Sequence, residues 1–130
     1  MEGGQPIAWF ADRLEARIVL AAAEGGALLG TAGFRALEGP KDRHKGVLFG
    51  MYVRPSARRR GIGAALVEAI LVHAAESVEQ VQLTVGVANT PARRLYARLG
   101  FVEWGIERQA LKHGGVYFDD VWMVKFLASG

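Results

Sequence analysis

Residues 51–66 read Met-Tyr-Val-Arg-Pro-Ser-Ala-Arg-Arg-Arg-Gly-Ile-Gly-Ala-Ala-Leu, an apolar run joined to a helix through a basic loop that ends in glycine. Pro55 ends the run, because proline cannot donate a hydrogen bond to a sheet. A helix that begins after Gly61 presents unpaired backbone N–H groups and the positive end of its dipole. Glycines let a phosphate approach those groups, and the arginines at 58–60 add positive charge. These residues therefore predict a site for a phosphorylated anion.

The composition indicates one folded domain. The chain has 130 residues, of which 51% are hydrophobic and 22% charged, so we assign residues 1–130 to a single domain with its own core. Cysteine is absent, which excludes disulfides, thiolate metal sites and cysteine nucleophiles. The longest apolar run, Ile18–Ala23, is too short to cross a membrane, and no basic-then-apolar leader begins the chain. We therefore expect a cytoplasmic protein with no membrane partner.

The formal net charge of +3 suits an anionic partner, either a phosphorylated small molecule or a nucleic acid. Much of the positive charge is local, because Arg54 and the arginines at 58–60 occur together with no acid among them. Such a concentrated charge favours a small anion over a long nucleic-acid track. The segment 54–60 also contains no aromatic residue on which a base could stack. A nucleic-acid-binding domain is therefore the less favoured alternative, and we expect no nucleic-acid partner.

The spacing of apolar residues, together with turn and capping signals, predicts three helices and six strands. In chain order they are a helix from Pro6 over 7–14, strands over 18–23, 27–35 and 46–53, a helix over 62–76, a strand over 80–88, a helix over 91–99, and a terminal hairpin of 101–111 and 116–127. The first helix depends on Ile7, Phe10, Ala11 and Leu14, which occur at helical spacing.

The strand Gly46–Val53 is expected in the middle of the sheet, because both of its faces are apolar. Simple alternation places Val47, Phe49, Met51 and Val53 on one face, and Leu48, Gly50 and Tyr52 on the other. The helix that follows returns the chain to Gln80–Ala88, which should make the two strands parallel neighbours. The predicted fold class is α/β, a mixed sheet with helices on both faces.

Two motifs in this framework resemble the GCN5-related N-acetyltransferase (GNAT) superfamily. Arg58-x-x-Gly61-x-Gly63 looks like its acetyl-CoA signature, and Asn89-x-x-Ala92-x-x-Leu95-Tyr96-x-x-Leu99-Gly100-Phe101 matches a second element at the expected distance downstream. The resemblance extends from Val19 to the C-terminus. It implies a GNAT-like fold, acetyl-CoA as co-substrate and the transfer of an acetyl group to a primary amine by direct attack in a ternary complex.

The resemblance also implies roles for individual residues. Backbone N–H groups of Arg59 through Ala64 would cradle the pyrophosphate, and backbone groups near Met51 and Val53 would hold the pantetheine arm. A backbone N–H around Tyr52 or Val53 would polarise the acetyl carbonyl. The full set of expected cofactor-binding residues is Met51, Tyr52, Val53, Arg58, Arg59, Arg60, Gly61, Ile62, Gly63, Ala64, Asn89, Arg93 and Tyr96.

Tyr96 is the expected catalytic residue, because the resemblance assigns it to the leaving thiolate of CoA. The unperturbed pKa of a phenol, about 10, is near enough to that of a thiol for the two groups to share a proton. Asn89 would reach the pantetheine, and Arg93 the outer phosphates. The alternatives are structural roles: Tyr96 as a core aromatic residue, and Asn89 as a turn residue before the Thr90 helix cap.

The acceptor and the general base stay open at this point. The acceptor is an amine on a small molecule or a peptide, and the loop Leu37–Lys45 and the turn Lys112–Gly115 are candidates for its rim. Four residues are candidates for the base, namely Glu38, His44, Glu107 and Asp119. The three histidines share no ligand spacing, so we expect no metal.

The N-terminus departs from the family pattern, which begins with a strand and two helices. Only a short segment precedes Ile18–Ala23, which implies that the first strand and one helix are missing. Without a partner, Ile18–Ala23 would be an exposed sheet edge, and such edges tend to pair with other chains. We expect either the second subunit of a homodimer or the segment Met1–Glu15 to cover it. The departure keeps open a GNAT-fold module that binds acyl-CoA without turnover.

Overall fold

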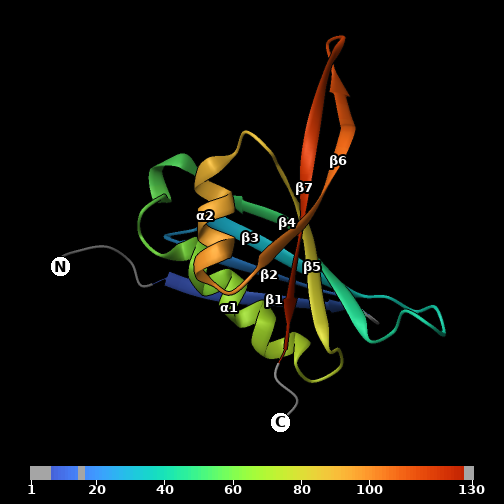
Figure 1. Cartoon of the computed structure of the whole chain (residues 1–130). Helices are drawn as coiled ribbons and strands as arrows, with labels where there is room; N and C mark the ends of the chain where they lie inside the picture. The colour runs from blue at the N-terminus through green and yellow to red at the C-terminus, as the bar shows by residue number, and fades with distance from the viewer. Residues whose placement is uncertain (1–6, 15–16, 128–130) are drawn as a thin grey trace.

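A mixed sheet of seven strands, in the order β1-β2-β3-β4-β5-β7-β6, forms the framework of the protein in the computed structural model (Figure 1). The structure describes residues 7–14 and 17–127. The elements are β1 Ile7–Leu14, β2 Arg17–Glu24, β3 Ala27–Ala36, β4 Lys45–Val53, the 3₁₀ turn η1 Pro55–Ala57, α1 Ile62–Ala74, β5 Gln80–Gly86, α2 Thr90–Arg98, β6 Val102–His113 and β7 Val116–Phe126. Within these ranges, no helix is long and apolar enough to cross a membrane.

The first element is a strand, so the predicted helix over 7–14 is wrong. All eight residues of β1 pair antiparallel with β2, from Ile7 opposite Glu24 to Leu14 opposite Arg17. Helical spacing of four apolar residues is a weak local preference, and pairing with the otherwise open edge of β2 overrides it. Pro6 lies outside the described residues. One of the two expected covers of Ile18–Ala23, the segment 1–15, is confirmed over residues 7–14.

The prediction that the first strand is missing is also wrong, whereas the helix that was expected to be missing is indeed absent from the described residues. β1 supplies the first strand. Because β1 ends at Leu14 and β2 begins at Arg17, the segment between them is too short for a helix. No helix precedes β2 in the described part of the chain. The sheet begins with two antiparallel hairpins, β1–β2 and β2–β3, and neither face gains a helix from this region.

A β-bulge at Gly50 changes the facing of β4. The register between β3 and β4 shifts between Thr31 and Gly33 of β3. Gly50 has a φ of +61°, and its carbonyl oxygen accepts a hydrogen bond from the Thr31 hydroxyl at 2.9 Å. The extra residue places Met51 on the same face as Leu48, where its side chain lies against Gly63 at the start of α1. The prediction that side chains alternate regularly between the two faces along the whole of this strand is therefore wrong.

Both helices pack on the same face of the sheet, which corrects the expectation of helices on both faces. The ring of Phe34 on β3 lies edge-on to His73 of α1, with 6.0 Å between centroids. The side chain of Leu95 on α2 lies near Gly63 of α1, so the two helices are neighbours. Figure 1 shows α1 and α2 together in front of β1–β3. The core fills the space between these helices and the sheet, and its fully buried side chains include Ile18, Phe34, Leu66, Val67, Ile70, Val81, Leu83, Val121 and Met123.

The opposite side of the sheet carries no helix from the described residues, and we call it the open face. Strand register assigns to it Arg17, Val19, Gly33, Arg35, Val47, Phe49, Gln82, Thr84, Trp122 and Val124. The Arg17 guanidinium lies over the Phe49 ring, 5.7 Å from its centroid. Trp104 and Trp122 also meet, with 6.0 Å between ring centroids. Beyond the sheet, β6 and β7 continue as a two-stranded arm that projects from the body (Figure 1).

The expected parallel pairing of β4 and β5 is confirmed, but over only three residues of each strand. Lys45, Gly46 and Val47 pair with Gln80, Val81 and Gln82. Both strands then continue without pairing to each other, while β5 pairs with β7 along its other edge. We call the region beyond Val47 and Gln82 the β4–β5 fork.

Candidate active site

The β4–β5 fork leaves two backbone edges facing each other without ladder hydrogen bonds between them. On one side are the residues of β4 up to Val53, and on the other those of β5 up to Gly86. An unpaired strand edge can bind an extended, amide-containing chain as though it were another strand. The end of β4 leads through η1 and the arginine loop directly to α1, so the fork opens toward the first turn of that helix (Figure 1).

The first turn of α1 begins without a side-chain cap. Gly61 is its N-cap in the left-handed conformation, with a φ of +77°, and no side chain caps the turn. Arg59 also has a positive φ, of 68°, which folds the loop tightly against the helix start. Because no side-chain acceptor satisfies the first backbone N–H groups, a phosphate could accept their hydrogen bonds. The structure brings Gly61, Ile62, Gly63 and Ala64 together in this turn, as expected.

The arginines of the loop have different surroundings. Arg58 Nε donates to the carbonyl oxygen of Val53 at 3.3 Å, which ties the loop to the end of β4. Arg60 makes two parallel hydrogen bonds to the Glu24 carboxylate, at 3.1 and 2.9 Å. This contact lowers the pKa of Glu24 and raises that of Arg60. A phosphate contact from Arg60 stays a prediction, and Glu24 would compete for the same guanidinium.

Asn89 and Arg93 hold the start of α2. Asn89 Oδ1 accepts from the backbone N–H of Ala92 at 3.3 Å, so Asn89 caps the helix, and the prediction of Thr90 as the cap is wrong. Arg93 donates to the Val87 carbonyl oxygen at 2.6 Å and to both oxygens of Glu103, at 2.8 and 2.9 Å. The hydrogen bonds to Arg93 lower the pKa of Glu103. These contacts are structural, and the cofactor roles expected of both residues stay predictions.

Tyr96 lies in the core between α2 and the sheet, with 5% of its surface exposed. Its ring meets Phe101 edge-on at 5.8 Å, in the same buried cluster as Leu83 and Val85 of β5. Burial raises the pKa of Tyr96 to about 12. The phenol therefore keeps its proton at physiological pH and can donate it, although the raised pKa makes it a weaker acid than the unperturbed phenol assumed from the sequence.

Three carboxylates gather where β5, β6 and β7 pass the open end of the fork. Asp120 is opposite Gly86 on one side and Glu107 on the other. The Glu107 carboxylate accepts from the Trp122 indole N–H at 3.0 Å, and that of Asp119 accepts from the backbone N–H of Gln109 at 2.8 Å. Desolvation, followed by the charges of Glu107 and Asp119, raises the pKa of Asp120.

Of the four expected candidates for the general base, Glu107 is the one beside Asp120, while Asp119 orders the bulge around Gln109. Glu38 and His44 lie before β4, at the closed end of the fork. Asp120 was missed by the sequence reasoning. The sequence signal that could have identified Asp120 is the alternation of side chains along β7. This alternation puts Asp120 on the same face as Trp122, whereas Asp119 points to the other face.

The fold and this arrangement together define an acetyltransferase framework: a mixed sheet with a fork after its fourth strand and a glycine-opened helix at the mouth of the fork. The family model "Acetyltransferase (GNAT) family" matches residues 2–101. The chain belongs to this family.

Individual relatives support the assignment. A mycothiol acetyltransferase from Salinispora tropica is 33% identical over 108 residues, covering 74% of this chain and 35% of the relative. A ribosomal-protein-alanine N-acetyltransferase from Brucella melitensis superposes with a TM-score of 0.79 at 28% identity, covering 87% of this chain and 70% of that chain. A Salmonella typhimurium acetyltransferase solved with its cofactor acetyl-CoA has the same fold, with a TM-score of 0.78 at 22% identity over 88% of this chain and 66% of that chain. The chain spans less than half the length of the curated relatives it matches.

Proposed function

We propose that this chain transfers the acetyl group of acetyl-CoA to a primary amine by direct attack, with both substrates bound together. The observation that carries the proposal is the β4–β5 fork, whose mouth ends at the uncapped first turn of α1. A fork with unpaired strand edges suits a pantetheine arm, and an uncapped helix start with arginines beside it suits a pyrophosphate. Relatives and structural neighbours that are acetyltransferases support the same reading.

The chain's own residues would divide the binding work along the fork. Backbone N–H groups of Gly61–Ala64 would hold the pyrophosphate, with Arg58 and Arg59 adding charge. The free edge of β4 at Met51–Val53 would hold the pantetheine, and a backbone N–H around Tyr52 or Val53 would polarise the acetyl carbonyl. Acetyl-CoA itself supplies an acyl thioester that is already activated toward amines.

Two side chains would move the protons. The acceptor nitrogen forms a bond to the acetyl carbon while the carbon–sulfur bond breaks. The thiolate that leaves takes the phenolic proton of Tyr96, and the Asp120 carboxylate takes a proton from the amine. The raised pKa of Asp120 makes this carboxylate a stronger base than an ordinary aspartate. No metal takes part in this scheme, and the described residues contain no group of three or more His, Asp or Glu that could hold one.

The test is release of CoA thiol from acetyl-CoA in the presence of a panel of amines. Because the chain contains no cysteine, a thiol reagent reports only CoA and meets no protein background. We expect amine-dependent thiol release, and we expect it to fall with CoA affinity in an Arg58→Ala, Arg60→Ala double variant. Glu24→Ala is the control for Arg60, because it removes the Glu24 contact and leaves the guanidinium in place.

Each outcome separates the alternatives. CoA binding with no thiol release for any amine would favour a non-catalytic acyl-CoA-binding module. The open face supports that alternative, because the described residues supply no helix that covers this face, on which the acceptor would bind. Binding of short duplex DNA without binding of CoA would overturn both readings.

A further inference from the structure

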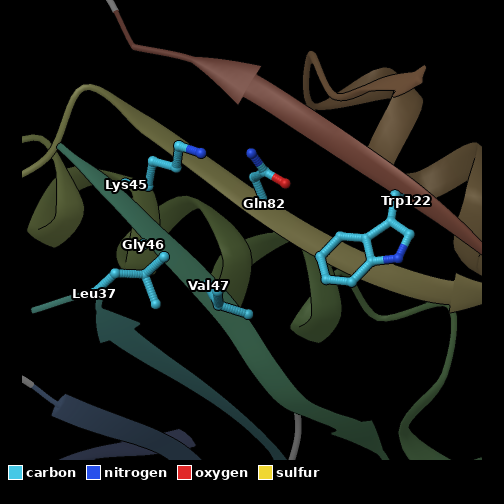
Figure 2. Close-up of a pocket in the computed structure, with 6 residues that line it drawn as sticks. All are labelled: Leu37, Lys45, Gly46, Val47, Gln82 and Trp122. Carbon is cyan, nitrogen blue, oxygen red and sulfur yellow. The ribbon is translucent and has the colours of Figure 1, made fainter. Parts of the chain in front are cut away.

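A pocket of about 290 Å³ lies on the open face at the closed end of the β4–β5 fork (Figure 2). Its volume is at the small end of the range for ligand-binding pockets. Val47 and Gln82, which line it, are also the last residues that β4 and β5 pair together. The other lining residues are Leu37, Lys45, Gly46 and Trp122. The pocket therefore lies further toward the closed end of the fork than the expected path of the pantetheine arm at Met51–Val53.

The pocket combines apolar walls with a cation. Leu37, Val47 and the Trp122 indole supply the apolar surface. Figure 2 shows the amino group of Lys45 directed across the pocket toward the Gln82 amide, and no carboxylate is among the lining residues. The register places Arg35 on the same face, directly opposite Val47. Such a lining attracts an anionic group that is attached to an apolar stem.

Two hydrogen bonds fix the walls before any ligand binds. The Trp122 indole N–H donates to Glu107 at 3.0 Å, which holds the ring in place over the pocket. The Gln82 amide nitrogen donates to the Gln80 side chain at 2.8 Å, which sets the orientation of the amide. A preformed pocket loses less entropy when a ligand binds than a pocket that must first be ordered.

We propose that this pocket binds the anionic far end of the acceptor, and that the acceptor is a short peptide with a free carboxylate or a molecule of the same shape. This rests on the proposed function. From Val47 to Tyr52, where a backbone N–H is expected to polarise the acetyl carbonyl, five residues of strand span about 16 Å. That distance separates the N-terminal amine of an extended pentapeptide from its carboxylate. A free amino acid is too short to reach both places.

The experiment compares acetylation of the pentapeptide Ala-Leu-Ala-Leu-Ala with that of the same peptide amidated at its C-terminus. For the unmodified protein we expect kcat/KM to favour the free carboxylate by about tenfold, as for one charge-assisted hydrogen bond. In Lys45→Met we expect the two peptides to have about equal kcat/KM values, because the cation that binds the carboxylate has been removed. Lys125→Met is the matched control, since Lys125 lies on the helix-covered face beside Gly100, and it should keep the tenfold preference.

Three results would overturn the proposal: equal rates for the two pentapeptides, a preference that survives in Lys45→Met, or acetylation of other amines with neither pentapeptide accepted. If CoA binds but no amine is acetylated, calorimetric titration of both pentapeptides into the CoA-saturated protein gives the same comparison as a ratio of Kd values. If neither CoA binding nor acetylation is found, the proposed function itself has failed.

Discussion

Replacing Gly61 with alanine changes the helix start at a single point. Gly61 has a φ of +77°, and an added Cβ would meet nothing within 4 Å, so the substitution introduces backbone strain without a clash. The left-handed conformation costs a non-glycine residue about 1–2 kcal/mol. A chain of this length unfolds with an entropy of about 0.27 kcal/mol/K, so we expect Tm to fall by about 4–7 °C.

The same Cβ would occupy the space through which a phosphate reaches the backbone N–H groups of α1. We expect the affinity for CoA to fall about tenfold or more, which corresponds to the loss of about one hydrogen bond to a charged group. Gly115 provides a matched control, because its φ is +79° and a Cβ there also meets nothing within 4 Å. Gly115 lies in the turn between β6 and β7, far along the chain from α1.

Thermal unfolding and calorimetric titration with CoA, applied to both variants, separate strain from binding. Gly61→Ala and Gly115→Ala should lose similar stability, and only Gly61→Ala should lose CoA affinity. An unchanged CoA affinity in Gly61→Ala would refute the assignment of the α1 N-terminus to the pyrophosphate. A similar loss of affinity in both would mean that the effect is one of general stability.

Three further variants test the remaining parts of the site and the core. Tyr96→Phe should keep its affinity for acetyl-CoA while kcat falls about 100-fold or more, because the proton donor is lost; unchanged turnover in the thiol-release assay would remove Tyr96 from the chemistry. Asp120→Asn should abolish most turnover yet raise Tm at pH 7, because the raised pKa of Asp120 means that its charged form is destabilised by folding. That gain in Tm should disappear as the pH falls below about 4, where the carboxyl is protonated in both the folded and unfolded states; a gain that does not change with pH would contradict the reasoning. Phe34→Ala removes a ring that is 1% exposed, and it should cost about 3–5 kcal/mol in chemical denaturation, with a cost below about 1 kcal/mol arguing against this packing.

Local signals were enough to predict the elements that frame the expected cofactor site. Pro55, Gly61 and the apolar stripe from Ile62 to Ala74 determine where β4 stops and α1 starts, and these signals act within a few residues. The same holds for α2, which ends before Gly100 as expected, although its cap is Asn89, one residue before the predicted Thr90. The order of these elements then leads to the parallel pairing of β4 and β5.

Features that depend on distant partners were not predicted. The spacing of Ile7, Phe10 and Leu14 is helical, and only the free edge of β2 makes the segment a strand. The contact partners of Arg60 and Arg93 are Glu24 and Glu103, which the fold alone brings near them. Nothing in the separate motifs indicates these ion pairs.

The bulge in β4 had a local signal that alternation ignored. A glycine inside an otherwise strong strand often marks a bulge, and Gly50 is such a residue. The bulge reverses the facing of Met51 and Val53 and turns them toward α1. The acceptor side was harder to predict, because Lys45, Gln82 and Trp122 come from three different strands.

The central claim is that CoA binds between the β4–β5 fork and the first turn of α1. The most direct measurement is a titration of the isotope-labelled protein with CoA, followed through the backbone amide signals in NMR spectra. The account predicts that the largest shifts occur at Gly61–Ala64 and at Met51–Val53, with saturation at micromolar CoA. An absence of binding, or shifts concentrated on the β6–β7 arm while these two segments stay unchanged, would contradict it.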